Sequence, residues 1–352
     1  MTRLMNIRYK FPAAVLFLIF INTTTFCQEP YFSQYFNTPL LYNPAMTGLS
    51  DGLKVRVNYR NQWPQYNDDL KTYNFSMDVA ERFMPGAGGL GIIFNTNKEG
   101  DGFIRKNTIG GLGSARIRMS RNLVSQLGFM VSYVQNQIDN NDFIWSDQLD
   151  NRHGLLYPTS SFAGFENKNV SYADMSIGAL LHYEQEYMSM TYGGAIHHLF
   201  KPNESFYSLE MNVPRKYVLH ANFVILQVSN ARKGFRFNPG ILFENQSGYN
   251  TFSLGTNVSK SVLYAGAWYR NKDSQIYNYE SLTLLVGINI PMVNKYSRIK
   301  MMYSYDINIA NMPGTGGSHE ISLRFEFDQI HLVKSQDAFA NDYPIIYDPV
   351  IF

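Results

Sequence analysis

The sequence predicts an all-β protein, a 14-stranded antiparallel transmembrane β-barrel of a Gram-negative outer membrane. Three observations predict it: an N-terminal leader, period-two alternation of apolar and polar residues along most of the chain, and connections that alternate between short and long. Aromatic residues make up 15% of the chain and charged residues only 16%, well below the usual proportion of roughly a quarter. This composition suits a protein whose strands face lipid.

The first residues have the order of a secretory signal peptide. Three basic residues and no acidic one lie in the first ten positions. The apolar run Phe11–Ile21 follows and is much shorter than the ~20 residues of a spanning helix. We expect cleavage between Cys27 and Gln28, with 1–27 as the signal peptide. A lipoprotein cut before Cys27 is the alternative, which the bulky Phe26 disfavours.

Charge and cysteine content exclude several classes of protein. Without the leader the chain keeps 27 basic residues against 28 acidic ones, so its net charge is −1 and no nucleic-acid partner is expected. Cys27 is the only cysteine, which leaves none for a disulfide or for catalysis in the mature chain. No apolar run of 18 residues follows the leader, so no spanning helix is expected.

Alternation along the chain predicts the strands. In Tyr73–Val79, Phe252–Val258 and Ile321–Phe327 every second residue is apolar, which gives a strand one apolar and one polar face. There are 14 such runs, most of them 9–13 residues long, as a tilted strand needs to cross a bilayer. They begin near Leu53, Thr72, Gly89, Asn107, Asn122, Tyr172, Tyr187, Lys216, Phe235, Thr251, Val262, Ser281, Arg298 and His319.

The connections predict the orientation and the segments of the chain. Outer-membrane barrels have short periplasmic turns and long external loops, and an even strand number returns both ends to the periplasm. The barrel is expected to cover 53–328, with its polar face lining the lumen. Residues 28–52, which contain three prolines, are expected to form a periplasmic or plug segment. Residues 329–352 form a C-terminal tail, either a docking peptide or disordered.

No arrangement of residues in the sequence predicts a metal site or a catalytic site. His197 and His198 end a strand, so we expect them on opposite faces, where they cannot share a metal. In Ser318–Glu320 the histidine faces away from the other two residues, which defeats a catalytic relay. We therefore expect no catalytic residue, no cofactor and no metal, and a protein that is not an enzyme.

A lumen charge seam is expected where the first and last strands meet, because a barrel in lipid leaves no edge open. The two basic residues near the periplasmic end of the first strand would meet Glu326 and Asp328, and Arg60 would approach Glu320. Arg324 is expected to pair elsewhere, with Asp306 as the candidate. The six residues of the seam are Lys54, Arg56, Arg60, Glu320, Glu326 and Asp328.

Residues 138–170 are expected to form the largest external loop. Aromatic side chains stand there among charged ones, a composition typical of protein-binding surfaces. The alternative is a loop that folds inward as a lumen plug. The aromatic residues of this candidate partner loop are Trp145, Tyr157, Phe162 and Phe165.

Motifs at both ends of the mature chain resemble one family. Gln28–Gly48 with Asn58–Trp63, and Tyr303–Asp306 with Gly316–Leu323, resemble the PorP/SprF outer-membrane proteins of Bacteroidota, which are associated with type IX secretion and gliding motility. The resemblance implies a barrel that assists secretion or surface anchoring of a cognate cell-surface protein. The implied partners are outer-membrane lipid, a secreted adhesin or its C-terminal domain, and periplasmic secretion or gliding components.

Two other functions remain open at this point. A passive transporter for small hydrophobic molecules would need a continuous apolar path through the lumen, whereas a charged, plugged lumen would favour the assisting role. A secreted soluble β-protein, such as a lectin, is the second alternative.

Overall fold

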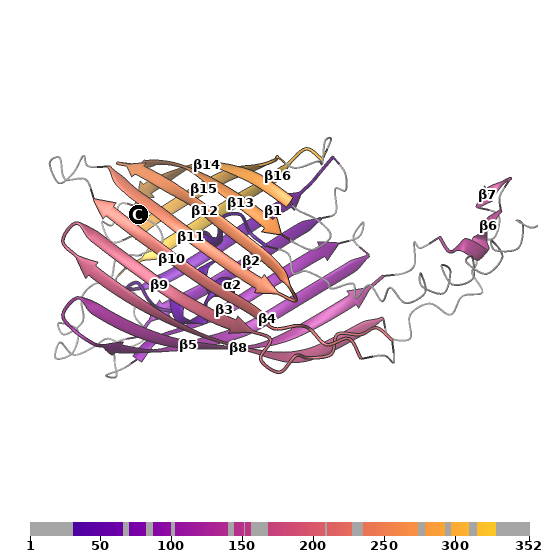
Figure 1. Cartoon of the computed structure of the whole chain (residues 1–352), viewed down its shortest axis with the longest axis horizontal. Helices are drawn as coiled ribbons and strands as arrows, with labels where there is room; N and C mark the ends of the chain where they lie inside the picture. The colour runs from indigo at the N-terminus through magenta and orange to yellow at the C-terminus, as the bar shows by residue number, and fades with distance from the viewer. Residues whose placement is uncertain are drawn as a thin grey trace, which may run out of the picture.

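Antiparallel strands close into one barrel in the computed structural model (Figure 1). The structure describes residues 31–65, 70–81, 87–99, 103–139, 144–150, 152–155, 168–207, 210–226, 235–273, 279–292, 297–309 and 315–328. The barrel strands are β1 (Leu53–Gln62), β2 (Lys71–Ala80), β3 (Ala87–Glu99), β4 (Ile104–Arg118), β5 (Leu123–Ile138), β8 (Asn169–Gln185), β9 (Met188–His197), β10 (Lys216–Leu226), β11 (Arg236–Gln246), β12 (Tyr249–Lys260), β13 (Leu263–Asp273), β14 (Tyr279–Pro291), β15 (Ser297–Asn308) and β16 (Ser318–Phe327).

The predicted fold class is confirmed, because the structure is a closed barrel of 14 antiparallel strands. β1 and β10 begin at the predicted residues. The largest shift is three residues, at β4 and β8, which begin at Ile104 and Asn169. No helix among the described residues is long and apolar enough to cross a membrane.

Closure occurs between the first and last strands. In this antiparallel pair Leu53 lies opposite Phe327 and Gln62 lies opposite Ser318. We call the two ends of the barrel the Leu53 end and the Gln62 end, after the first and last residues of β1. The two longest connections between consecutive barrel strands, 139–168 and 198–215, both lie at the Gln62 end.

The two faces of the wall differ as the alternation predicts. In β5 the outward side chains Leu127, Phe129 and Val131 are 50–55% exposed. The residues between them point inward, and Met130 and Ser132 are buried. The apolar outside and the largely polar inside are the arrangement of a membrane barrel, and the reverse of a soluble one.

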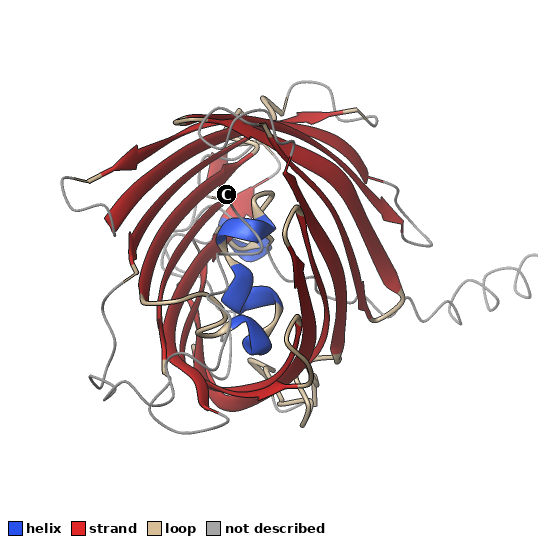
Figure 2. Cartoon of the chain, turned by 90° about the vertical axis from the view of Figure 1, so that its left-hand side faces the viewer, coloured by secondary structure: helices blue, strands red, loops and turns tan. Residues whose placement is uncertain are grey.

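Short helical turns of the segment before β1 lie inside the barrel (Figure 2). They are η1 (Tyr35–Asn37), α2 (Pro39–Tyr42) and η2 (Pro44–Met46). Pro39 and Pro44 each occupy the first position of a turn, where the absence of an N–H group carries no penalty. Another short element, the hairpin β6 (Leu149–Asp150) and β7 (Gly154–Leu155), follows η3 (Ser146–Gln148) and lies away from the barrel wall (Figure 1).

Candidate functional site

Residues 31–52, which we call the plug, cross the lumen from the Gln62 end to the Leu53 end. Near its start, the backbone N of Ser33 donates to Glu320 Oε2 at 2.7 Å, and Glu320 lies at the beginning of β16. Near its end, the backbone N of Gly48 donates to Asp78 Oδ2 at 2.8 Å, and Asp78 lies at the end of β2. The chain therefore enters the lumen at one mouth and joins β1 at the other.

The wall is shaped to admit the plug closely. A Cβ atom added at Gly128 in β5 would lie 2.4 Å from the backbone of Pro44 and Ala45. One added at Gly178 in β8 would lie 2.0 Å from Asn43 Oδ1. Both positions therefore need glycine, because any side chain there would overlap the plug.

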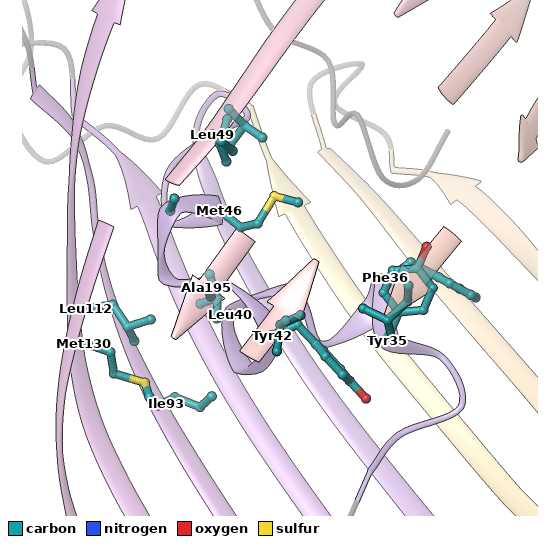
Figure 3. Packing of buried hydrophobic residues seen from close by; sticks show 14 of the residues in the cluster. Tyr35, Phe36, Leu40, Tyr42, Met46, Leu49, Ile93, Leu112, Met130 and Ala195 are labelled. Atoms are coloured by element: carbon teal, nitrogen blue, oxygen red, sulfur yellow. The ribbon is translucent and has the colours of Figure 1, made fainter. Parts of the chain in front are cut away.

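Apolar side chains of the plug complete the contact. Phe36 and Leu40 are fully buried, and Phe36 packs against Trp268 of β13 with ring centroids 5.7 Å apart. The same apolar cluster includes the wall residues Ile93, Leu112 and Met130, which lie apart from Phe36 in Figure 3. This apolar cluster lies within an otherwise polar lumen, so burial of the plug side chains stabilises the occupied state.

A tyrosine of the plug is held by a polar contact. The Tyr35 hydroxyl donates to Asn222 Oδ1 in β10 at 2.6 Å. Tyr35 is 3% exposed, so this hydrogen bond satisfies a polar group that water does not reach.

The structure brings together two of the expected pairs at the seam. Lys54 Nζ lies 2.6 Å from Asp328 Oδ1, and Arg60 Nη1 lies 3.2 Å from Glu320 Oε2. Arg60 also reaches Asp306, with Nη2 2.8 Å from Oδ2, which the sequence did not predict. Both side chains of the Arg60–Glu320 pair are buried in the lumen.

Two expectations for the seam are wrong. Arg56 lies opposite Arg324 in the β1–β16 register, and it pairs with Asp78 of β2 instead of an acid of β16. Two like charges face each other there, so Arg56 turns to the other neighbouring strand. Arg324 pairs with Glu326 at 2.8 Å and not with Asp306, because Asp306 lies opposite Ser318, six residues or roughly 20 Å further along the sheet.

The carboxylate of Glu204 attaches the loop 198–215 to three strands of the wall at the Gln62 end. Glu204 Oε2 lies 3.3 Å from Lys106 Nζ, and it accepts hydrogen bonds of 3.2 Å from both Asn136 and Tyr172. These donors come from β4, β5 and β8. A cavity of about 90 Å³ lies in this part of the lumen, and its lining includes Tyr31 at the start of the plug.

The two consecutive histidines do not lie on opposite faces. His198 adopts a left-handed φ of 56°, which breaks the strand alternation, and both rings are buried. His198 Nδ1 lies 2.9 Å from Asp174 Oδ2, and His197 Nδ1 lies 3.0 Å from Ser176 Oγ. Within the described ranges, no three His, Cys, Asp or Glu residues are placed to hold a metal ion.

One aromatic residue of the candidate partner loop, Trp145, lies within the described residues. Trp145 is half-buried beside η3, where its backbone N donates to Gln148 Oε1 at 2.8 Å. The other aromatic residues of the candidate partner loop, the expected cleavage site and the tail lie outside the described residues. These are Tyr157, Phe162, Phe165, Cys27, Gln28 and 329–352.

Comparison with known proteins identifies a family model that covers most of the chain. Residues 24–325 match the model described as "Type IX secretion system membrane protein PorP/SprF". No curated protein matches the chain.

Solved outer-membrane proteins show a distant likeness. A Pseudomonas aeruginosa FadL homologue has a TM-score of 0.43 at 10% identity, covering 81% of this chain and 92% of that chain. The Acinetobacter baumannii outer membrane protein Omp33 has a TM-score of 0.41 at 9% identity, covering 80% and 100%. The Pseudomonas putida toluene transporter TodX has a TM-score of 0.42 at 7% identity, covering 85% and 95%.

Proposed function

The chain belongs to the PorP/SprF family of type IX secretion system membrane proteins, and on this premise we propose that it assists the secretion or the surface anchoring of a cognate cell-surface protein. It is an outer-membrane barrel. In this proposal it acts by binding and carries out no reaction of its own. The observation that carries the proposal is the plug, which occupies the lumen along its length.

The plug supports an assisting role over passive transport of small hydrophobic molecules. Such a transporter needs an apolar path, but here the described lumen holds buried ion pairs such as Arg60 with Asp306, and plug residues such as Leu40 are wholly buried against the wall. A hydrophobic solute would have to displace the plug and lie against charged groups, which is unfavourable.

The outer face argues against a secreted soluble β-protein. Val57, Phe129 and Ile321 are 40–50% exposed on the outside of three strands, together with many other large apolar side chains. In water this band would be an aggregation surface, whereas in a bilayer it is the surface that lipid contacts.

We propose that the Leu53 end faces the periplasm and the Gln62 end faces the outside. The longest connections lie at the Gln62 end, as external loops of outer-membrane barrels do. The connection 139–168 would then be available to a cell-surface protein, with Trp145 as one of its aromatic contacts. The C-terminal end of β16 would face the periplasmic components of the secretion or gliding machinery.

Replacing residues 140–167 by a Gly/Ser linker of equal length in the native host tests this proposal. We expect the barrel to remain in the outer membrane, while the surface protein that co-purifies with the wild-type barrel is lost from the cell surface. Mass spectrometry of the solubilised complex identifies that protein.

Two controls separate the outcomes. Normal surface display in the linker strain would reject the role of the loop. Normal display in a strain that lacks the whole barrel would reject the proposed function itself.

A further inference from the structure

Two basic side chains of β13 stand around the first described residue of the plug. The Arg270 guanidinium carbon lies 4.1 Å from the centre of the Tyr31 ring, and Lys272 Nζ lies 5.6 Å from it. Both residues are near the end of β13, so they face the lumen at the Gln62 end. A tyrosine ring attracts cations through its negative face, but it does not neutralise them.

Arg270 and Lys272 differ from the other cations nearby in their lack of a paired carboxylate among the described residues. Arg60 has Asp306 at 2.8 Å, and Lys216 has Glu244 at 2.8 Å. In the part of the chain that the structure describes, no carboxylate lies within ion-pairing distance of Arg270 or Lys272. The charges of Asp306 and Glu244 act on Arg270 and Lys272, but these two acids are already paired with Arg60 and Lys216. The described side chains in this part of the lumen therefore carry an excess of positive charge.

The neighbouring strands offer hydroxyl groups instead of acids. Arg270 lies opposite Ser253 of β12 and Ser281 of β14. Its Nε donates to Ser253 Oγ at 3.1 Å, and its Nη2 donates to the Phe32 carbonyl at 3.1 Å.

Two buried polar groups remain without a hydrogen-bond partner. Arg270 is 3% exposed and Ser281 is 0% exposed, yet Arg270 Nη1 and Ser281 Oγ have no partner among the protein atoms. Side chains directly opposite each other on neighbouring strands have Cβ atoms only about 5 Å apart, so one ligand can reach both groups.

We infer that Arg270, Lys272 and Ser281 form a carboxylate-binding site at the Gln62 end of the lumen. Nη1 of the guanidinium supplies a charged donor to one carboxylate oxygen, the ammonium supplies a second charge, and the hydroxyl supplies a further donor. This site is independent of the proposed secretion role, which stands if the site fails its test.

The carboxylate has two possible sources. One is Glu29, which stands two residues before Tyr31 in the sequence. The other source is an acidic group of a polypeptide that enters the mouth of the barrel. Both present the same chemistry to the site, so the test must distinguish them.

The test measures the thermal unfolding midpoint of the mature full-length protein in detergent, in sodium acetate and in sodium chloride of equal ionic strength. A ligand that binds only the folded protein raises the midpoint as its concentration rises. If Glu29 fills the site, the wild type shows no acetate-specific rise and Glu29→Gln acquires one. If the source is external, the wild type itself shows the rise.

Variants of the site and a matched control complete the experiment. Either rise must disappear when Lys272→Gln is added, because Lys272 makes no hydrogen bond to the plug and its loss should leave the fold intact. It must persist with Lys260→Gln, an exposed lysine at the end of β12. The inference is overturned if neither the wild type nor Glu29→Gln responds to acetate, or if the response survives Lys272→Gln.

Discussion

Arg60 of the first strand and Glu320 of the last strand face each other across the closure of the barrel, with Nη1 3.2 Å from Oε2. The same carboxylate accepts the backbone N–H groups of Ser33 and Gln34 at 2.7 and 3.1 Å. One acidic side chain therefore joins both edges of the sheet to the plug. Closure of the barrel and docking of the plug share this contact, so we expect them to be coupled energetically.

Replacing Arg60 should be much more damaging than replacing Lys54. Arg60→Met leaves Asp306 and Glu320 buried without their cation, which should lower the free energy of unfolding by about 3–5 kcal/mol. Lys54→Met should cost under ~1 kcal/mol, because Asp328 is 26% exposed and keeps Arg298 at 2.7 Å. Urea unfolding followed by gel mobility measures both. Equal losses would show that the buried ion pairs of Arg60 contribute no more to the free energy of unfolding than the pair of Lys54.

A side chain placed at Gly128 should displace the plug without opening the wall. Gly128→Leu would overlap Pro44 and Ala45, which costs about 1–3 kcal/mol of packing if the plug stays. We expect the plug to leave, so conductance in planar bilayers should rise while the barrel stays resistant to SDS.

The matched control is Gly111→Leu. Gly111 is exposed on β4, and an added Cβ there meets nothing within 4 Å. It should leave conductance unchanged. An unchanged conductance in Gly128→Leu as well would mean that the plug tolerates displacement inside the lumen.

The course of the plug predicts where the mature N-terminus is accessible. Tyr31 lies at the Gln62 end, and with cleavage before Gln28 only three residues precede it. The mature N-terminus should therefore lie at the Gln62 end as well. An epitope inserted after Gln28 should bind antibody on intact cells. An epitope in the β8–β9 turn at Glu186-Tyr187, at the Leu53 end, should bind only after permeabilisation. The reverse pattern would invert the proposed orientation of the barrel.

The strands and their closure could be predicted from sequence because lipid imposes a strict period of two. A one-residue slip would turn Lys54, Arg56 and Arg60 into the bilayer, where a basic residue costs ~2–4 kcal/mol. Pairing between the first and last strands follows from that alternation and from the need to close the edge.

The pairing of side chains in the lumen was less predictable, because each side chain there can reach partners on several strands. Alternation places Arg56 in the lumen, but only the register shows that Arg324 faces it and that Asp78 is the available acid. The helical turns of the plug have no periodic pattern at three or four residues each. Pro39 and Pro44 were a usable signal for their starts.

The contacts of Glu204 with the wall should hold the loop 198–215 closed against the barrel. Glu204 Oε2 is surrounded by donors from three different strands, so the carboxylate fixes the loop to the wall of the mouth. Glu204→Gln removes the charge and weakens contacts that are each worth about 1.5–3 kcal/mol when one partner is charged. We expect the loop to open more often, so that chymotrypsin cleaves at Phe206 or Tyr207 about tenfold faster or more.

Glu210 is the matched control, because it lies exposed in the same loop and makes no contact that the structure describes. Glu210→Gln changes the net charge of the loop by the same amount, and its cleavage rate should equal that of the wild type. If both variants are cleaved equally fast, the change in charge alone accounts for the faster cleavage, and the contacts of Glu204 do not hold the loop. If neither differs from the wild type, the loop is held by its other contacts with the wall, such as the 3.1 Å hydrogen bond from Leu199 N to the Met175 carbonyl of β8.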